Sequence, residues 1–304
     1  MPVWDADVEI SEAIALGLVQ NQFPALGAKR IELVGEGWDN AAFLIDGEWL
    51  FRFPRRKMAE ELMQNECRVL PYLAKSLTLP IPIPVYRGRP ERGYPYPFAG
   101  YRYVAGAPAC LLDWSDEERA ANAGILGSFL RSLHSAPLDA GVLEWAPRDH
   151  MRRADLPYRH ERNEAMTREL GQAIGEIDAS AVIALSAQLS LARPYEGPER
   201  WVHGDAYACH FLADEERRIC GVIDWGDAHL GDPAIDISIA FGFLPAWARA
   251  AFVSAYGSVD EETWKRAQFR ALHYGLIMLM YGRESGKDGM VKLGFDILRL
   301  VFET

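Results

Sequence analysis

The spacing of hydrophobic residues differs between the first hundred residues and the rest of the chain. In the first part, short runs with apolar residues at every second position predict strands over 31–35, 41–45 and 48–53. The pair Asp46 and Gly47 between the last two runs is typical of a two-residue turn, because both residue types tolerate a positive φ. We therefore expect an antiparallel hairpin at this point.

Two helices and an extended segment complete the first part of the chain. Apolar residues with helical spacing predict helices over 8–22 and 59–74, on either side of the strands. Three prolines between positions 80 and 84 predict an extended connection, because proline removes a backbone donor and restricts φ. This connection leads to another predicted strand at 98–103.

Beyond residue 106 the pattern is mainly helical. Ser115 followed by Glu118 has the signature of a helix-capping box. One β-like segment, 201–223, interrupts the helical pattern. We therefore predict a two-lobed α+β fold, with a small β-rich lobe over 1–103 and a larger, mainly helical lobe over 104–304. The helices expected in the second lobe are 115–135, 161–177, 179–192, 245–256, 261–281 and 291–302.

Composition and charge narrow the classes of partner. The 304 residues are 49% hydrophobic, which is ordinary for a globular protein, and the net charge is -11. Such an acidic chain is a poor partner for the phosphate backbone of nucleic acid. No apolar run approaches the length of a membrane span, and acids stand where a signal peptide has a basic region. We expect a soluble, cytoplasmic protein without a nucleic-acid or membrane partner, and the sequence carries no indication of oligomeric state.

The cysteines give a similar indication of compartment. They are widely separated and contain no CxxC pair, which suits a reducing compartment and argues against a zinc ribbon. We expect most of them to be small core residues. Cys209 in particular is interpreted as structural, because the sequence places no general base for it. The four are Cys67, Cys110, Cys209 and Cys220.

A glycine-containing loop separates the first two predicted strands. It contains Gly35, Gly37 and Asn40 in the sequence GEGWDN. A dinucleotide fingerprint would open a helix, whereas a strand follows here. The loop instead resembles the flap that covers phosphates in kinases, where glycine lets backbone amides approach the anion. A plain turn is the open alternative.

A charged pair is predicted between the third strand and the following helix. In the sequence WLFRF, Arg52 points to the face opposite Phe51 and Phe53. Glu66 lies on the apolar, core-facing stripe of the helix, where a carboxylate is costly unless it is paired. An Arg52–Glu66 pair would mimic the lysine and glutamate that hold nucleotide phosphates in kinases. The alternative for Arg52 is a solvated strand charge.

The β-like segment of the second lobe carries the strongest chemical pattern. Asp205 and His210 lie in HGDAYACH, and Asp224 lies in GVIDWGD, each sequence following a short apolar run. Phosphoryl transfer needs one carboxylate that orients the acceptor hydroxyl and accepts its proton, and further ligands that hold Mg²⁺ against the phosphates. This pattern contains both.

Four motifs together resemble one enzyme family. The sequences HGDAYACHFL, GVIDWGDAHLGDPAIDIS, GEGWDNAAFL and WLFRFPRR are similar to those of the aminoglycoside phosphotransferase family, which has the protein-kinase-like fold. The resemblance runs from about Val34 to Ile239. It implies Mg²⁺ as metal, ATP or GTP as phosphoryl donor, and a small-molecule hydroxyl as acceptor.

The resemblance also implies roles for individual residues. Asp205 would be the catalytic base, and His210 and Asp224 would be the metal ligands. Asp227 would either assist the metal site or bind the acceptor. The residues expected to bind nucleotide are Gly35, Gly37, Asn40, Arg52, Glu66, Tyr101 and Tyr103, of which the two tyrosines belong to a hinge over 98–104.

Two positions depart from the usual pattern of the family. The family usually has Asn at the position of His210 and often Lys at that of Arg52. Macrolide phosphotransferases resemble this sequence in carrying His at the first position. Arginine keeps the positive charge and can grip a carboxylate with two hydrogen bonds.

Several alternatives to an antibiotic kinase stay open. One is a metabolic kinase for an amino alcohol such as choline or homoserine, and another is an inactive nucleotide-binding pseudokinase. A binuclear metal hydrolase is a third, but it gives no reason for the glycine loop or the Arg52–Glu66 pair. Its ligands would be His203, Asp205, His210, Asp224 and His229.

The distribution of charge bears on the acceptor. Residues 1–100 carry a net charge of -2 and the remainder carries -9. A second lobe rich in acids would attract cations, so we expect an amine-bearing acceptor, unless these acids only keep the surface soluble.

The remaining polar residues near the motifs are interpreted as structural. His203 is expected to support the catalytic loop rather than to titrate in catalysis. Asp232 and Asp236 are expected to brace the site as caps, and His134 is expected to be a packed helix residue.

Overall fold

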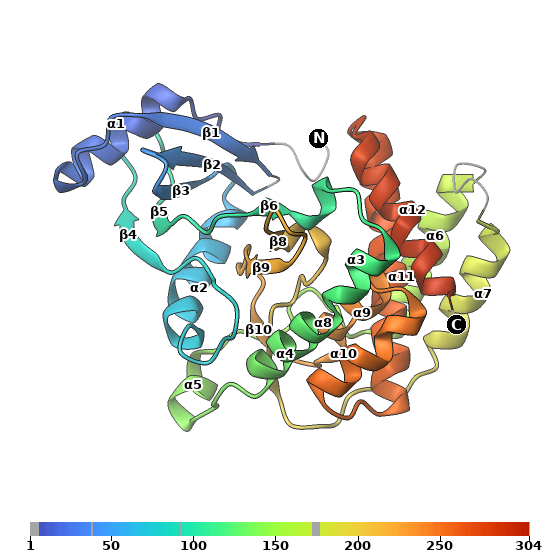
Figure 1. Cartoon of the computed structure of the whole chain (residues 1–304). Helices are drawn as coiled ribbons and strands as arrows, with labels where there is room; N and C mark the ends of the chain where they lie inside the picture. Colours follow the sequence, from blue (N-terminus) through green and yellow to red (C-terminus); the bar gives the residue numbers. More distant parts are fainter. Residues whose placement is uncertain (1–5, 38, 92, 172–176, 304) are drawn as a thin grey trace. The chain divides into compact units, whose positions relative to one another are not determined.

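The computed structural model describes residues 6–37, 39–91, 93–171 and 177–303 (Figure 1). The chain forms two compact units. The first ends at Lys75, resumes over Pro80–Ala105 and also contains Asp224–Ala228. The second contains Ser76–Leu79, Gly106–Ile223 and the chain from His229 onward. The boundary expected near residue 103 does not account for two short segments. Ser76–Leu79 belongs to the second unit, and Asp224–Ala228 belongs to the first.

The first unit is built on a five-stranded antiparallel sheet. Its strand order is β1-β2-β3-β5-β4, and helix α1 packs on the sheet face that carries Phe43, Phe51 and Phe53. Alternate residues of β3 point to the opposite face, which is the side of helix α2. The elements are α1 (Glu12–Gln22), η1 (Pro24–Leu26), β1 (Ile31–Glu36), β2 (Asn40–Ile45), β3 (Trp49–Pro54), α2 (Met58–Leu73), β4 (Pro84–Gly88) and β5 (Phe98–Arg102).

The predicted hairpin is confirmed. Asp46 and Gly47 have φ values of 50° and 73°, as the two central residues of such a turn require, and Glu48 is a third loop residue whose N–H donates to the carbonyl of Ile45. The turn sets the register of β2 and β3, in which Ile45 lies opposite Trp49. The extended connection after the proline run contains an additional strand, β4, which pairs with β5.

The second unit is mainly helical and carries two small sheets. One sheet pairs β7 with β10, and the other has the order β6-β8-β9. The strands are β6 (Ala107–Pro108), β7 (Arg200–Val202), β8 (Phe211–Ala213), β9 (Ile219–Val222) and β10 (His229–Gly231). The helices are η2 (Ala109–Leu111), α3 (Asp116–Ala121), α4 (Ala123–His134), α5 (Ala140–Trp145), α6 (Leu156–Leu170), α7 (Ala179–Leu189), η4 (Ala208–His210), α8 (Ala234–Ile237), α9 (Ile239–Gly242), η5 (Ala246–Ala248), α10 (Arg249–Tyr256), α11 (Glu261–Glu284) and α12 (Asp288–Phe302).

The helix expected over 115–135 is divided in two at Asn122. The capping box of Ser115 and Glu118 is present and starts α3 as predicted. The amide of Asn122 donates to the carbonyls of Glu118 and Arg217, and its side-chain oxygen accepts the N–H of Ile219. Two of these bonds join Asn122 to the β8–β9 hairpin. The sequence around Asn122 gives no sign of this distant contact.

Other helices differ at their ends. Helix α6 begins five residues before the expected start at 161, because the side chain of Asp155 caps it by accepting the N–H of Tyr158. The last part of that predicted helix falls on residues 172–176, which lie outside the described residues. Helix α11 forms as predicted, and its apolar stripe Phe269, Leu272, Leu276 and Leu279 is buried. Among the described helices, none combines the length and the apolar character that crossing a membrane requires.

Candidate functional site

The segment that carries Asp205 and His210 connects the two small sheets of the second unit. Strand β7 leads into residues 203–207, η4 follows, and β8 then forms a hairpin with β9. Gly204 has a φ of 82°, in the left-handed region that favours glycine. The short strands thus fix both ends of the segment, while the glycine lets it turn.

His203 and Asp236 brace this segment from inside. The carboxylate of Asp236 accepts the N–H of His203 at 2.6 Å and that of Gly204 at 3.0 Å. Nε2 of His203 donates to the carbonyl of Ile223 at 2.9 Å, and its Nδ1 accepts the N–H of Asp205 at 3.3 Å. Burial lowers the pKa of His203, and both of its nitrogens are hydrogen-bonded. His203 therefore supports the loop, as predicted.

Asp236 is itself held in its charged form. Burial alone would raise the pKa of its carboxyl, but the hydrogen bond from His134 and the other partners outweigh this effect and lower the pKa. Nε2 of His134 lies 3.1 Å from Asp236, and Nδ1 lies 2.8 Å from the hydroxyl of Tyr256. His134 is packed as expected, and it also belongs to this brace.

The side chains of Asp205 and His210, the two predicted site residues of this segment, lie next to each other. Nδ1 of His210 donates to the backbone carbonyl of Asp205 at 2.8 Å and lies 3.5 Å from Oδ2 of the same residue. A carbonyl accepts only, so this bond places the imidazole proton on Nδ1. Nε2 then carries the lone pair through which a neutral histidine ligates a metal. Oδ1 of Asp205 accepts a hydrogen bond from the hydroxyl of Tyr274 at 2.6 Å.

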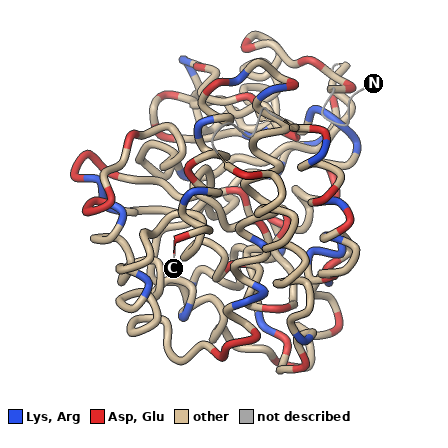
Figure 2. The backbone as a smooth tube through the Cα atoms, turned by 90° about the vertical axis from the view of Figure 1, so that its right-hand side faces the viewer, with Lys and Arg blue, Asp and Glu red and all other residues tan. Residues whose placement is uncertain are grey.

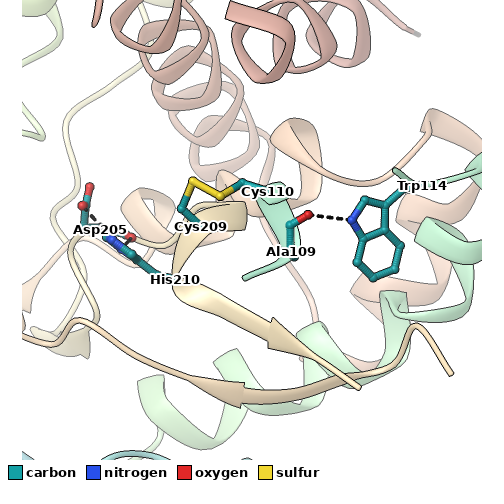
Figure 3. The surroundings of a disulfide bond; sticks show 6 residues. All are labelled: Ala109, Cys110, Trp114, Asp205, Cys209 and His210. Carbon is teal, nitrogen blue, oxygen red and sulfur yellow. Dashed lines mark hydrogen bonds and ion pairs between the residues drawn. A yellow bond between two sulfur atoms is a disulfide. The ribbon is translucent and has the colours of Figure 1, made fainter. Parts of the chain in front are cut away.

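A disulfide lies beside this segment (Figure 3). Cys209, directly before His210, is bonded to Cys110 of η2, with the two Cα atoms 4.7 Å apart. Cys209 is structural, as predicted, but the bond contradicts the indication of a reducing compartment, in which disulfides are rare. The sequence carries no sign of the bond, because residues far apart in sequence meet where η2 packs beside η4. Cys67 and Cys220 remain thiols.

In the first unit, Arg52 joins two carboxylates. Its Nη1 donates to both oxygens of Glu66, at 2.9 and 2.7 Å, and its Nη2 donates to Oδ1 of Asp224 at 2.9 Å. The predicted Arg52–Glu66 pair is confirmed, and the side chain of Glu66 is only 1% exposed. Burial alone would lower the pKa of Arg52, but the two carboxylates outweigh it and raise the pKa. The guanidinium therefore stays charged.

The segment Asp224–Ala228 is fixed to helix α2. The amide of Asn65 donates to the carbonyls of Gly226 at 2.8 Å and Ala228 at 3.0 Å. Asp224 has a φ of 63°, a left-handed conformation that aspartate adopts more readily than most residues. Asn65 lies one position before Glu66, and no sequence motif marks it.

A third carboxylate is electrostatically linked to Asp224 and Asp227. Burial raises the pKa of Asp39, repulsion from Asp224 and Asp227 adds to this effect, and an ion pair with Arg56 at 2.5 Å opposes it. Asp39 lies in the glycine-containing motif directly before Asn40. Its pairing with Arg56 places a half-buried negative charge at the start of β2.

The glycine loop connects β1 and β2 as predicted. The N–H of Gly37 donates to the carbonyl of Asn40 at 2.9 Å and closes the turn, and Nη1 of Arg55 donates to the carbonyl of Gly37 at 3.1 Å. The strand register shifts between Leu33 and Gly35, which marks a bulge before the turn. Trp38 of the same motif lies outside the described residues.

The two hinge tyrosines differ in accessibility. Tyr101 is 0% exposed, so its side chain is enclosed by the first unit, and a nucleotide contact at this position would have to come from the backbone. Residues alternate along β5, which turns this ring into the unit. Tyr103, just beyond β5, is 37% exposed.

These features agree with a comparison of the sequence with protein families. A model of the phosphotransferase enzyme family matches residues 30–270. The chain belongs to this family. The phosphotransferase is also 21% identical, over 277 residues and 83% of each chain, to the uncharacterized protein YcbJ of Bacillus subtilis (strain 168).

Solved structures share the fold of the phosphotransferase. The GDP complex of wild-type aminoglycoside 2'-phosphotransferase-IIIa is 22% identical, with a TM-score of 0.70 and coverage of 96% of this chain and 98% of that one. The macrolide 2'-phosphotransferase MphH from Brachybacterium faecium, as apoenzyme, is 21% identical, with a TM-score of 0.59 and coverage of 94% and 97%. The predicted kinase-like α+β fold is confirmed.

The residues predicted as metal ligands suit a magnesium ion only in part. Carboxylate oxygens such as those of Asp224 are preferred Mg²⁺ ligands, whereas the imidazole of His210 is not. Over the ranges that the structure describes, no group of three or more His, Cys, Asp or Glu side chains is arranged to hold a metal ion by itself. Phosphate oxygens and water commonly complete Mg²⁺ sites in kinases, so a partial protein site is compatible with this chemistry.

Proposed function

We propose that the chain is a kinase that transfers the γ-phosphoryl group of ATP or GTP to a hydroxyl group of a small molecule. The observation that carries this proposal is the ion pairing of Arg52 with Glu66 and Asp224 in the first unit. A buried arginine held between a helix carboxylate and a proposed metal ligand has the arrangement of a phosphate-binding cation. A hydrolase has no use for it.

Each residue has a defined task in this reaction. The acceptor oxygen attacks the γ-phosphorus, the bond to the β–γ bridging oxygen breaks, and the nucleoside diphosphate leaves. Asp205 orients the acceptor hydroxyl and takes its proton, and Arg52 stabilises the phosphate charge. His210 and Asp224 are the proposed ligands of Mg²⁺, which when bound neutralises charge on the phosphates. Asp227 is proposed to assist the metal site or the acceptor.

The remaining nucleotide contacts are assigned to the glycine loop and the hinge. The backbone of Gly35 and Gly37 is proposed to cover the phosphates, with Asn40 closing the turn. Tyr103 has an exposed ring and is the proposed aromatic contact for the base. We propose a cytoplasmic location, because the donor nucleotides are made and used there. The Cys110–Cys209 disulfide argues against a reducing compartment, so this proposal rests on the nucleotide alone.

For the acceptor, we propose an amine-bearing hydroxyl compound such as an aminoglycoside or an amino-sugar macrolide. Support comes from the names of the structural neighbours, which include aminoglycoside and macrolide 2'-phosphotransferases, and from the excess of acids after residue 100. Figure 2 shows acidic and basic residues interspersed along the tube, so any attraction of a cation must come from local groups of acids. An amino alcohol of metabolism is the alternative acceptor.

The metal-hydrolase alternative is weakened by the brace of the catalytic loop. Both ring nitrogens of His203 are engaged with the backbone, one as donor and one as acceptor. A histidine in that state has no lone pair left for a metal. His203, one of the five ligands that a metal hydrolase would need, is therefore not able to bind a metal in this state.

The proposal is tested by phosphate transfer to a panel of aminoglycosides, macrolides and amino alcohols with MgATP or MgGTP. Asp205→Asn should lower kcat by about 10²-fold or more, the scale of general-base loss, while the thermal shift caused by MgATP persists. The matched control is Asp113→Asn, which changes an aspartate that is 93% exposed. An Asp205→Asn enzyme with wild-type kcat removes Asp205 from the mechanism, and nucleotide binding without transfer to any hydroxyl indicates a pseudokinase.

A further inference from the structure

Helix α11 contributes one side chain, that of Tyr274, to the segment that carries Asp205. We propose that Tyr274 is a positioning residue, whose hydroxyl holds one oxygen of the Asp205 carboxylate and thereby aims the other oxygen at the acceptor hydroxyl. This inference rests on the proposed kinase function. It adds a residue that none of the motifs contains.

The contact between the two side chains is short and directional. The hydroxyl of Tyr274 donates to Oδ1 of Asp205 at 2.6 Å, the distance of a charge-assisted O–H···O⁻ bond. Tyr274 is 4% exposed, and burial raises the pKa of its phenol well above the usual value. The phenol therefore keeps its proton and acts as a donor. Oδ2 of Asp205 remains on the side of His210, 3.5 Å from its Nδ1.

The tyrosine ring is itself held in place. It stacks on the ring of Tyr207 with centroids 5.2 Å apart and an interplanar angle of 22°. The guanidinium of Arg270 lies 4.1 Å from the centroid of the Tyr274 ring, one turn away on the same helix. Arg270 is 7% exposed, so this cation–π contact is well shielded from water. Contacts of this kind restrict the rotation of the ring about its side-chain bonds.

Removal of the Tyr274 hydroxyl should reduce the rate of transfer by freeing the orientation of the Asp205 carboxylate. An aspartate side chain rotates readily about its last bond, because that torsion has a broad energy profile. With Oδ1 bound to Tyr274, one orientation is selected and Oδ2 alone is left for the acceptor. Without the hydroxyl, the carboxylate samples other orientations, and the acceptor is aligned for a smaller fraction of the time.

The test compares Tyr274→Phe with Tyr94→Phe. Tyr94 is also buried, and its hydroxyl donates to the carbonyl of Pro54 in the first unit, so its loss is a matched control for a missing buried hydrogen bond. Tyr274→Phe should lower kcat for phosphate transfer about tenfold, the scale of one hydrogen bond to a charged group. The KM for nucleotide should stay within about twofold of the wild-type value, because the bond between Tyr274 and Asp205 does not contribute to nucleotide binding.

A double variant separates positioning from a general loss of packing. In an Asp205→Asn background, Tyr274→Phe should have almost no further effect on kcat, because the two residues act as one unit. A full additional tenfold loss in that background overturns the inference. So does a kcat of Tyr274→Phe equal to wild type, or an equal loss in Tyr94→Phe.

Failure of the kinase proposal gives a different result. In that case the wild-type protein itself phosphorylates no hydroxyl compound. Failure of the present inference leaves an active wild type together with an equally active Tyr274→Phe enzyme.

Discussion

Reduction of the Cys110–Cys209 disulfide should lower the stability of the second unit substantially. Both cysteines belong to that unit, and their sequence separation is 99 residues. A crosslink between distant residues restricts the unfolded chain more than the folded one. Reduction of the bond should therefore lower the free energy of unfolding of the second unit.

The size of the effect follows from the length of the closed loop. For a separation of 99 residues, the chain-entropy relation gives a loss of about 4.7 kcal/mol in the free energy of unfolding at 25 °C. Measured disulfides commonly contribute about 2–4 kcal/mol, so the relation sets the upper end. With a urea m-value of about 3 kcal/mol/M, the range from about 2 to about 4.7 kcal/mol lowers the unfolding midpoint by about 0.7–1.6 M.

The assay is urea unfolding followed by tryptophan fluorescence, with and without a phosphine reductant. Wild-type protein should show the shift, and Cys110→Ser should show the lower midpoint under both conditions. Cys220→Ser is the matched control, because Cys220 lies outside the disulfide, and its reductant-dependent shift should persist. Mass spectrometry of the air-oxidised protein verifies the bond.

Two results would refute this reasoning. One is an oxidised protein, with the bond verified, whose midpoint does not change on reduction. The other is a reductant-dependent shift that persists in Cys110→Ser, because the stabilisation would then come from another source.

Further predictions concern the buried charges. Glu66→Gln leaves Arg52 with one charged partner and should lower the free energy of unfolding by about 3 kcal/mol. Urea unfolding measures this loss, with Glu61→Gln, which changes an exposed glutamate, as the control. An unchanged unfolding midpoint in Glu66→Gln would contradict the role of the pair. His273 donates from Nδ1 to Asn163 and accepts at Nε2 from Arg159, and burial together with nearby arginines lowers its pKa well below the usual value. Below about pH 6.5 the unfolded chain binds a proton that the folded chain does not, so stability should be full above pH 7 and fall with decreasing pH by up to about 1.4 kcal/mol per pH unit. His273→Gln should flatten that slope in urea unfolding measured from pH 7.5 to 5, and an equal slope in both proteins would show that His273 does not cause it.

The sequence predicted features that depend on local patterns. The Asp46-Gly47 turn follows from residue types that tolerate a positive φ, and the structure has it. The pairing of Arg52 with Glu66 followed from a carboxylate on an apolar helix stripe, because such a charge needs a partner. In both cases the reason lies within a few neighbouring residues or in one periodic face.

Features that depend on distant contacts could not be predicted in this way. Cys110 and Cys209 meet only because η2 packs beside η4. Asn122 interrupts a helix because its side chain bonds to the backbone of a distant hairpin. Tyr274 lies among core residues of α11, and the apolar spacing that correctly predicted the helix says nothing of the partner of its hydroxyl.

The assignment of Asp224–Ala228 to the first unit bears on how the protein could be divided into fragments. A fragment that ended at Ala105 would contain the whole five-stranded sheet and both of its helices. It would leave Arg52 without the Asp224 carboxylate, and it would leave the amide of Asn65 without the two carbonyls that accept its hydrogen bonds. Expression of this unit alone, or its exchange with that of a related chain, would therefore have to include those five residues as a separate, covalently linked segment.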